Sequence, residues 1–318
     1  MQTAKTPLFR GCGTALITPM KPRAEASPGL YVPPEVDFDA FVRLVRTQLA
    51  GGADALIVSG TTGESPTLTD DEKRRLFSLA VSEADAAHRN GVTPSRVPVI
   101  AGTGSNNTAR AIELSRIAQE SGCDGLLLVT PYYNKANQAG LVAHFTAVED
   151  AVPLPVIIYH VPSRTGCRLT VETCRALAAH PRVVGLKEAS GDVGFAARVI
   201  AACGDALPLY SGNDDLTLPL LALGACGVIS VVSNLVPGEV SALCRAAACG
   251  DLTEARRLHE HLLPLCDVLF ADVNPIPVKT AMEMCGMCRG DMRLPLCEAG
   301  KGVKEKITEV LKQYTIVR

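Results

Sequence analysis

The 318-residue sequence has no tryptophan, and aromatic side chains make up only 4% of it. It also lacks an excess of either charge, since 31 basic and 33 acidic residues give a formal net charge of -2. A nearly neutral chain gives no electrostatic reason to expect nucleic acid or an anionic membrane surface as a partner. Hydrophobic residues make up 47%, so a sizeable core can form. Because the charge balance suggests neither nucleic acid nor a membrane, the partners that we expect are small molecules.

Long uninterrupted hydrophobic runs are absent as well. The most apolar stretch, LTLPLLALGACGVISVV, is broken by Pro219, Gly224 and Gly227, which favours strand and helix segments over a membrane span. The first residues, MQTAKTPLFRGCG, lack the apolar segment of a signal peptide. We therefore expect no membrane association and a cytoplasmic location.

The pattern of cysteines and histidines does not predict a metal centre. Most of the twelve cysteines lie in apolar segments, where a thiol behaves as a small hydrophobic group. Only Cys285 and Cys288 have CxxC spacing, and no second CxxC or nearby histidine pair completes a zinc site. We predict no metal, although Glu64, Asp214 and Asp215 lie near predicted strand ends and leave a bound Mg²⁺ open as an alternative.

What the sequence does contain is a regular alternation of strand-like and helix-like segments. Eight short apolar runs are typical of buried strands: 13–18, 55–60, 97–102, 125–130, 155–160, 183–188, 207–212 and 227–232. Eight helical patterns follow them: 37–50, 69–87, 108–121, 138–151, 170–180, 193–203, 216–224 and 237–248. Such alternation implies parallel strands, and eight units over about 240 residues predict a (β/α)8 TIM barrel. A doubly wound open sheet is disfavoured because no G-x-G-x-x-G follows the first strand.

Two further segments lie outside this repeat. After Gly250, three helical segments, 252–270, 277–285 and 302–314, follow with no strands between them. We therefore predict a catalytic barrel over residues 1–250 and a C-terminal helical region over residues 251–318. The proline-rich stretch from Met20 to Val36 predicts a long loop on the active-site face, where it bears on access to the cavity.

The sixth predicted strand, VVGLKE, ends in a lysine. Because side chains alternate along a strand, Lys187 shares a face with Val183 and Gly185, and the glycine leaves empty space beneath it. Active sites of TIM barrels lie at the C-terminal ends of the strands, so Lys187 is expected at the rim of an apolar cavity. By itself, such a lysine is more typical of a side chain that reaches solvent or pairs with a carboxylate at the rim.

Other predicted strand ends carry hydroxyl groups and one more cation. Four of the six tyrosines are found there: Tyr132, Tyr133, Tyr159 and Tyr210. The loop SGTTGESPT places Thr61 and Thr62 between glycines, where backbone N–H groups and hydroxyls suit an anion. Arg164 follows the fifth strand in YHVPSRTG, where a guanidinium can bind a carboxylate or form a surface salt bridge.

A lysine, phenols, threonine hydroxyls and an arginine around one cavity are what Schiff-base chemistry requires. The amine must be neutral to attack a carbonyl, which costs about 4–5 kcal/mol at neutral pH from a reference pKa near 10.4. Burial can depress the pKa of a lysine by up to about 3–5 units and thus offset most of that cost. The iminium then acts as an electron sink while the hydroxyls transfer protons.

These motifs resemble the dihydrodipicolinate synthase (4-hydroxy-tetrahydrodipicolinate synthase) family of class I pyruvate-dependent aldolases. The similarity runs from about Gly11 to Leu296, through GTTGES, AGTGSNNTA, VTPYYN, YHVPSRTG, GLKEASG, YSGND, GVISV and NPIPVK. SRTG and NPIPVK favour the synthase over the related sialic acid lyases. Two positions depart from the family pattern, since His160 stands where asparagine is common and Asn213 where aspartate is common.

The resemblance implies a set of catalytic residues and an assembly. Lys187 would form an imine with pyruvate, and Tyr159 would donate and accept protons. Thr61 and Tyr133 would complete the proton relay, with Tyr133 reaching into the site of a neighbouring subunit. No cofactor beyond the imine is implied, and the assembly would be a homotetramer built as a dimer of tight dimers.

The resemblance also implies how the substrates are held. Thr62, helped by the backbone at Ile229 and by Gly212, would bind pyruvate, and Arg164 would receive the carboxylate of L-aspartate 4-semialdehyde. The product would enter lysine and diaminopimelate synthesis. The alternatives are a lyase of the N-acetylneuraminate type, acting on a keto-deoxy sugar acid, and a barrel that binds a carboxylate without turnover.

Lysine-inhibited members of the family hold L-lysine at the tight-dimer interface, through residues matching Ser65, Asn106 and Tyr132. A glutamate of that site is replaced here by Arg110, and two histidines of some members by Asp70 and Lys73. An arginine beside the ammonium group of the ligand would repel it unless it pairs with Glu113. We therefore predict weak or no inhibition by L-lysine.

Overall fold

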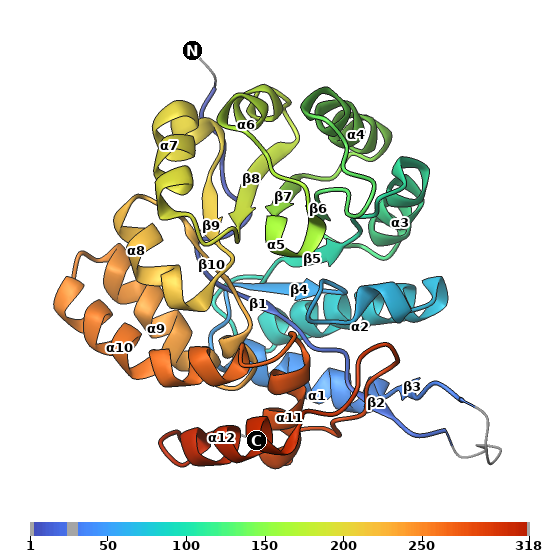
Figure 1. The fold of residues 1–318 in the computed structure, drawn as a ribbon, viewed down its shortest axis with the longest axis vertical. Helices are drawn as coiled ribbons and strands as arrows, with labels where there is room; N and C mark the ends of the chain where they lie inside the picture. Colours follow the sequence, from blue (N-terminus) through green and yellow to red (C-terminus); the bar gives the residue numbers. More distant parts are fainter. Residues whose placement is uncertain (1–2, 24–30, 317–318) are drawn as a thin grey trace.

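The computed structural model describes residues 3–23 and 31–316 and contains a closed barrel of eight parallel strands (Figure 1). In the order β1-β4-β5-β6-β7-β8-β9-β10 each strand pairs with the next, and β10 pairs with β1. The bounds are Gly11–Ala15, Ala55–Val58, Val99–Gly102, Gly125–Val129, Val156–His160, Val183–Glu188, Leu209–Ser211 and Gly227–Ser230. The predicted TIM barrel is confirmed.

Eight helices follow the strands and surround the barrel (Figure 1). They are α1 (Phe38–Ala50), α2 (Asp70–Arg89), α3 (Thr108–Glu120), α4 (Gln138–Ala151), α6 (Val171–Ala178), α7 (Val193–Cys203), α8 (Thr217–Ala222) and α9 (Pro237–Ala248). Helix α2 shows how the sequence sets such an element. Thr69 and Glu72 form a reciprocal capping box at its start, while Leu76, Phe77 and Ala80 form part of its buried face.

The interior of the barrel is filled by side chains from most of the strands, among them Ile57, Ile100, Leu127, Ile157, Tyr210 and Ile229. Tyr210 is completely buried, its ring stacks on Phe9 at 4.5 Å, and its hydroxyl donates a hydrogen bond to the carbonyl of Phe9 at 2.8 Å. A Cβ atom at Gly185 would lie 2.9 Å from this ring. The expected empty space beneath Lys187 is therefore occupied, and the expectation that Tyr210 stands at the rim is wrong.

The C-terminal region consists of α10 (Leu252–Leu269), α11 (Ile276–Met284) and α12 (Lys301–Leu311), which confirms three predicted helices. These helices share a core with the barrel, since Val228 of β10 and Val240 of α9 belong to the same buried cluster as Leu262 of α10. Helix α12 packs on α10 and α11, and α10 packs on α9 (Figure 1). The division of the chain near residue 250 stays a prediction.

The segment predicted as a long loop after β1 is partly regular. Strands β2 (Met20–Lys21) and β3 (Glu35–Val36) pair antiparallel, and residues 24–30 between them lie outside the described residues. The segment is fastened to the C-terminal region, because Arg293 donates to the carbonyl of Pro34 at 2.9 Å and the amide of Leu294 donates to the hydroxyl of Tyr31 at 2.9 Å. The described residues of this segment do not line the catalytic cavity described below.

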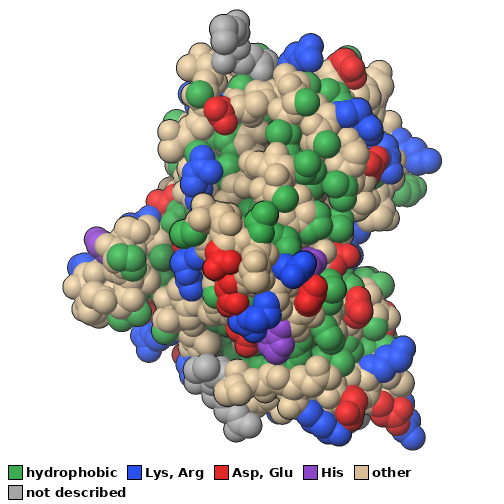
Figure 2. Space-filling view, turned by 90° about the vertical axis from the view of Figure 1, so that its left-hand side faces the viewer, with side chains coloured by type: hydrophobic (Ala, Val, Ile, Leu, Met, Phe, Trp, Pro, Cys, Tyr) green, Lys and Arg blue, Asp and Glu red, His purple; other side chains and the backbone are tan. Residues whose placement is uncertain are grey.

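Neither a metal-binding cluster nor a membrane-spanning helix is found among residues 3–23 and 31–316. No group of three or more histidine, cysteine, aspartate or glutamate side chains there is arranged to hold a metal ion. None of the helices described is both long and apolar enough to cross a bilayer. On the face shown in Figure 2, acidic and basic side chains lie next to one another and form no large patch of one sign.

Candidate active site

A cavity of about 160 Å³ lies at the C-terminal ends of the strands. Parallel strands point their carboxyl ends to one side of the barrel, which brings together residues that are far apart in the sequence. Six of the eight residues predicted for catalysis and substrate binding line this cavity: Thr61, Thr62, Tyr159, Arg164, Lys187 and Gly212.

Lys187 is buried near the end of β8, and only 6% of its surface is exposed. Its Nζ lies 4.3 Å from the centre of the Tyr159 ring. Burial lowers the pKa of Lys187 to about 8, because the charged form loses its hydration, while the carboxylate of Asp214 opposes the shift and Arg164 adds to it. At pH 7 about one such amine in ten is neutral, compared with fewer than one in a thousand for an unperturbed lysine.

Gly212 provides the room that the lysine side chain needs. A Cβ atom at this position would lie 3.0 Å from Cε of Lys187 and 2.6 Å from Cβ of Ala189. Any larger residue would press on the carbon next to the reactive nitrogen. This contact gives Gly212 a positioning role besides the substrate contact that was predicted for it.

Tyr159 lies beside Lys187, at the end of the neighbouring strand β7, and the two residues are paired in the sheet register. Burial raises the pKa of the Tyr159 phenol, so the hydroxyl stays protonated at neutral pH, although Arg164 and a hydrogen bond with Thr61 act in the opposite direction. The phenol and the threonine hydroxyl thus form a short chain of proton carriers next to the amine.

Arg164 lies on a single helical turn, α5 (Pro162–Thr165), where the sequence predicted a loop. Pro162 begins this turn and Gly166 ends it with φ at +66°, which are ordinary start and stop signals for a helix. Within the described part of the chain, the guanidinium of Arg164 has no hydrogen-bond or salt-bridge partner, although it lines the cavity. It is therefore available to bind the carboxylate of a substrate.

The C-terminal region contributes a wall residue that the sequence analysis missed. Asn274, which precedes α11, donates through Nδ2 to the hydroxyl oxygen of Thr62 at 3.0 Å. Because that oxygen accepts from Asn274, its own proton remains free to be donated to a ligand. Asn274 belongs to the NPIPVK motif, which had been quoted for the resemblance without a role for this residue.

The same motif anchors the loop that carries Thr61 and Thr62. Lys279 of α11 is completely buried, and its Nζ donates to Glu64 Oε1 at 2.6 Å, the Asp291 carbonyl at 2.6 Å and the Thr18 carbonyl at 3.0 Å. The second carboxylate oxygen of Glu64 accepts from the amide of Arg293 at 3.2 Å. Glu64 therefore joins the active-site loop to the C-terminal region and is not arranged as a metal ligand.

A buried carboxylate also lies close to the lysine. Asp214 accepts hydrogen bonds from the hydroxyl of Ser230 and from the amide of Val231, the latter at 2.9 Å. Burial raises the pKa of Asp214, while these donors and Lys187 lower it. Asp214 had been considered only as a metal ligand, whereas here it is the anion that acts most directly on Lys187.

His160 occupies one of the positions at which the sequence departs from the family pattern. Its Nδ1 lies 2.6 Å from Glu188 Oε2, and the amide of Leu169 donates to its Nε2 at 3.2 Å. Since Nε2 accepts, Nδ1 carries the proton that is donated to Glu188. This hydrogen-bonded pair joins β7 to β8, one residue further along each strand than the paired residues Tyr159 and Lys187.

Two predicted site residues do not line the catalytic cavity. Ile229 is buried in the barrel interior with 1% exposure. Tyr133 is 88% exposed and has a positive φ of 72°, and its amide donates to the carbonyl of Thr165 at 3.2 Å. A single chain therefore does not bring the Tyr133 hydroxyl to Lys187.

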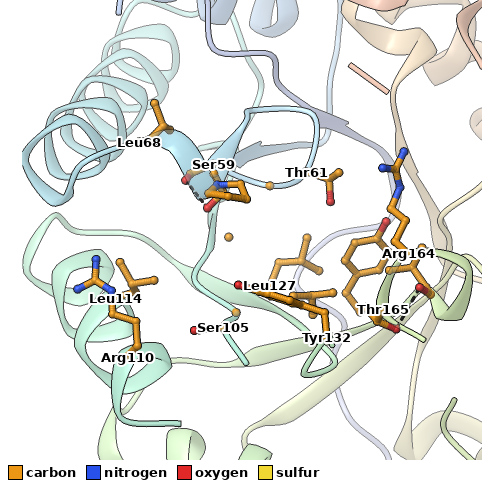
Figure 3. Close-up of a pocket in the computed structure, with 18 of the residues that line it drawn as sticks. Ser59, Thr61, Leu68, Ser105, Arg110, Leu114, Leu127, Tyr132, Arg164 and Thr165 are labelled. Atoms are coloured by element: carbon orange, nitrogen blue, oxygen red, sulfur yellow. Dashed lines mark hydrogen bonds between the residues drawn. The ribbon is translucent and has the colours of Figure 1, made fainter. Parts of the chain in front are cut away.

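A second cavity, of about 430 Å³, adjoins the first and shares Thr61, Tyr159 and Arg164 with it. Figure 3 shows Thr61 and Arg164 at one end and Arg110 and Leu114 at the other.

Three of the four residues predicted for the inhibitor site line this second cavity: Ser65, Arg110 and Tyr132. Asn106 does not, and instead its carbonyl accepts from Asn134 at 2.9 Å. Arg110 pairs with both Asp70 and Glu113.

Comparisons with known proteins agree over nearly the whole chain. The sequence profile of the dihydrodipicolinate synthetase family matches residues 8–314. A 4-hydroxy-tetrahydrodipicolinate synthase of Exiguobacterium sibiricum is 48% identical over 307 residues, which cover 96% of this chain and 98% of that protein.

Two solved structures are similar to this fold. The dihydrodipicolinate synthase of Aquifex aeolicus superposes with a TM-score of 0.87 at 44% identity and covers 96% of this chain and 98% of its own. A monomeric dihydrodipicolinate synthase variant gives a TM-score of 0.88 at 39% identity, with coverage of 96% and 97%.

Proposed function

Because the chain belongs to the dihydrodipicolinate synthetase family, we propose that it condenses pyruvate with L-aspartate 4-semialdehyde as a 4-hydroxy-tetrahydrodipicolinate synthase. The name of the relatives favours this lyase activity over the sugar-acid alternative. The observation that carries the proposal is Lys187, a buried amine with a pKa of about 8, beside the phenol of Tyr159. The product would serve lysine and diaminopimelate synthesis in the cytoplasm.

The first half of the reaction activates pyruvate. The neutral Nζ of Lys187 attacks the ketone carbon, and loss of water gives the imine. Tyr159 and Thr61 carry the protons that this dehydration requires. The hydroxyl of Thr62, held by Asn274, donates to the pyruvate carboxylate, together with the backbone near Gly212 and Ile229.

The second half forms the carbon–carbon bond and releases the enzyme. Loss of a proton from the pyruvate methyl group turns the imine into an enamine, which attacks the aldehyde carbon of the semialdehyde. The amino group of the semialdehyde then attacks the imine carbon, closes the ring and displaces Lys187 as a free amine. Arg164 holds the carboxylate of the semialdehyde during both steps. The proposed reaction needs no cofactor, because Lys187 itself forms the covalent intermediate.

Tyr133 completes the proton relay from a neighbouring subunit in this proposal. Its exposed side chain and its place outside the cavity of its own chain support that role. The assembly would then be a homotetramer made of two tight dimers. Activity should fall when a substitution splits the tight dimer, and a fully active monomer, measured by analytical ultracentrifugation beside the assay, would contradict the role.

A substrate comparison tests the proposed activity. The purified protein is assayed with pyruvate and L-aspartate 4-semialdehyde, and in parallel with N-acetylneuraminate and keto-deoxy sugar acids. We expect turnover of the first pair only, and none by Lys187→Ala. Faster turnover of a sugar acid would replace the synthase by the lyase, and no turnover of any substrate would favour a binding protein.

A further inference from the structure

Tyr133 is held in a backbone conformation that residues with side chains seldom adopt. Its φ is +72°, and that of Lys135, two residues further on, is +49°. A residue other than glycine stays in this left-handed region only where the surrounding structure holds it there. Because the Tyr133 side chain is 88% exposed, its direction depends on contacts of the backbone rather than on packing of the ring.

Two hydrogen bonds join the chain around Tyr133 to one residue, Thr165. The amide of Tyr133 donates to the Thr165 carbonyl at 3.2 Å, and the hydroxyl of Thr130 donates to Thr165 Oγ1 at 3.2 Å. Thr130 directly follows β6 and is completely buried. The loop after β6 is therefore attached to the turn α5 both where the loop begins and at Tyr133.

The hydroxyl of Thr165 is buried, with 4% exposure of the residue, and is fully used. Besides the bond from Thr130, Oγ1 accepts one from the amide of Cys167 at 3.2 Å. Its own proton faces two carbonyls, of Cys167 at 3.1 Å and of Val161 at 3.2 Å. Since a hydroxyl has one proton and two lone pairs, this group closes the turn from Val161 to Cys167 with its full capacity.

The same turn carries Arg164, the residue proposed to hold the carboxylate of the semialdehyde. Figure 3 shows Arg164 and Thr165 next to one another on this turn. Because the guanidinium has no hydrogen-bond or salt-bridge partner within the described part of the chain, its place depends on the backbone from which it projects. Thr165 itself does not line the catalytic cavity, so any effect on the reaction passes through its neighbours.

We propose that Thr165 is a positioning residue for two active sites at once. Its hydroxyl fixes the turn that aims Arg164 into the cavity of its own chain, and through the contacts to Thr130 and Tyr133 the same residue directs the Tyr133 phenol into the site of the neighbouring subunit. The inference rests on the proposed function, in which Arg164 binds the semialdehyde and Tyr133 completes the relay across the tight dimer.

Mixed dimers test the two halves of the proposal separately. A Lys187→Ala chain and a Tyr133→Phe chain are co-expressed with different affinity tags and purified through both tags. One site of the mixed dimer is complete, because it takes Lys187 and Arg164 from the Tyr133→Phe chain and Tyr133 from the Lys187→Ala chain. The mixed dimer should therefore be more active than either variant alone. If it is not, the cross-subunit role of Tyr133 fails and this inference fails with it, whereas the synthase activity is measured separately on the unmodified protein.

Thr165→Val is then introduced into one chain of the mixed dimer at a time. In the Lys187→Ala chain it reaches the complete site only through Tyr133, and we expect kcat to fall by about tenfold or more with both KM values within about threefold. In the Tyr133→Phe chain it adjoins Arg164 of the complete site, and we expect KM for the semialdehyde to rise by about tenfold or more, with KM for pyruvate within about threefold. An unchanged mixed dimer in either arrangement would contradict the proposal.

Two further substitutions separate positioning from a general loss of stability. Thr165→Ser keeps the hydroxyl and should bring kcat and KM back to within about threefold of the parent mixed dimer. Thr173→Val is the matched control, because it removes an equally buried hydroxyl, at 4% exposure, that donates to Gln138 at 2.6 Å outside both cavities. It should change neither constant by more than about threefold. If Thr173→Val acted like Thr165→Val, or if Thr165→Ser restored nothing, the positioning role would be wrong.

Thr130→Val gives a second route to the same answer if the Thr165→Val chain does not assemble. It leaves Thr165 in place and removes only the hydroxyl that joins β6 to it. Placed in the Lys187→Ala chain, it should lower kcat of the mixed dimer by about threefold or more, with KM for the semialdehyde unchanged. An unchanged kcat would overturn the proposed path from Thr165 to Tyr133.

Discussion

Replacing Lys279 by methionine should destabilise the protein and slow catalysis, although Lys279 lies outside the wall of the catalytic cavity. The side chain is completely buried and donates to Glu64 and to two carbonyl groups at 2.6–3.0 Å. Without it, the Glu64 carboxylate would keep only the amide of Arg293, at 3.2 Å, among its described partners. Removing one partner of a buried ion pair costs about 3–5 kcal/mol, a large part of the about 5–15 kcal/mol that stabilises a typical protein.

Loss of the ion pair between Lys279 and Glu64 should also affect the active site, through the loop that carries Thr61 and Thr62. Glu64 lies two residues after Thr62 and is one of the contacts that fix this loop to the C-terminal region, beside the hydrogen bond from Asn274 to Thr62. A loop that is free to shift by about 1 Å misplaces both threonines, and a displacement of that size can lower the rate by about 100-fold. We therefore expect kcat to fall in the folded fraction of Lys279→Met.

Urea denaturation followed by circular dichroism measures the free energy of unfolding, and steady-state kinetics measure kcat. In the double variant Lys279→Met/Glu64→Gln no buried charge remains unpaired, so we expect it to be more stable than Lys279→Met. Lys301→Met is the matched control, because that lysine is exposed and lies 3.8 Å from Glu305. It should cost less than about 0.5 kcal/mol. A cost below about 1 kcal/mol for Lys279→Met, or a double variant less stable than the single one, would refute the reasoning.

Three further predictions concern the reaction and its regulation. Tyr159→Phe removes only the proton-carrying hydroxyl and should lower kcat by about 10²–10⁴, whereas a loss below about threefold would mean that the ring merely packs. Since only the neutral amine of Lys187 attacks and its pKa is about 8, the rate of imine formation should rise about tenfold per pH unit below pH 8 and level off above it. A stopped-flow rate that keeps rising tenfold per pH unit up to about pH 10 would contradict the lowered pKa. L-Lysine should inhibit weakly or not at all, because the cation of Lys73 lines the cavity that would receive its ammonium groups, and Arg110 adds positive charge there although Asp70 and Glu113 neutralise part of it. Strong inhibition at low concentration in the coupled assay would show that inference to be wrong.

The barrel could be predicted because the periodicity of strands and helices is a local property of the sequence. The short helical turn at Pro162–Thr165 was predicted as a loop, although Pro162 and Gly166 are local signals that mark its ends. How deep Tyr210 lies in the barrel could not be predicted from the sequence. Alternation along a strand tells which side chains point inward, but only packing against Phe9 decides whether the ring lies at the rim or deep in the barrel.

The site residues that were missed depend on contacts between distant parts of the chain. Asn274 is 212 residues from Thr62, and Lys279 is 215 residues from Glu64. No local pattern pairs such residues, although a lysine that directly follows the apolar run Ile276–Val278 indicates a buried acid nearby. The role predicted for Tyr133 depends on a second chain, which neither the sequence nor the fold of one subunit supplies.

In the proposed mechanism Lys187 forms an imine with pyruvate, and chemical trapping shows whether that imine exists. The protein is incubated with pyruvate, reduced with borohydride, digested and analysed by mass spectrometry, with Lys187→Ala treated in parallel. We expect one reduced pyruvate adduct, on the peptide containing Lys187, and none in the variant. An adduct on another lysine, or no adduct in a protein that still turns over pyruvate, would contradict the mechanism.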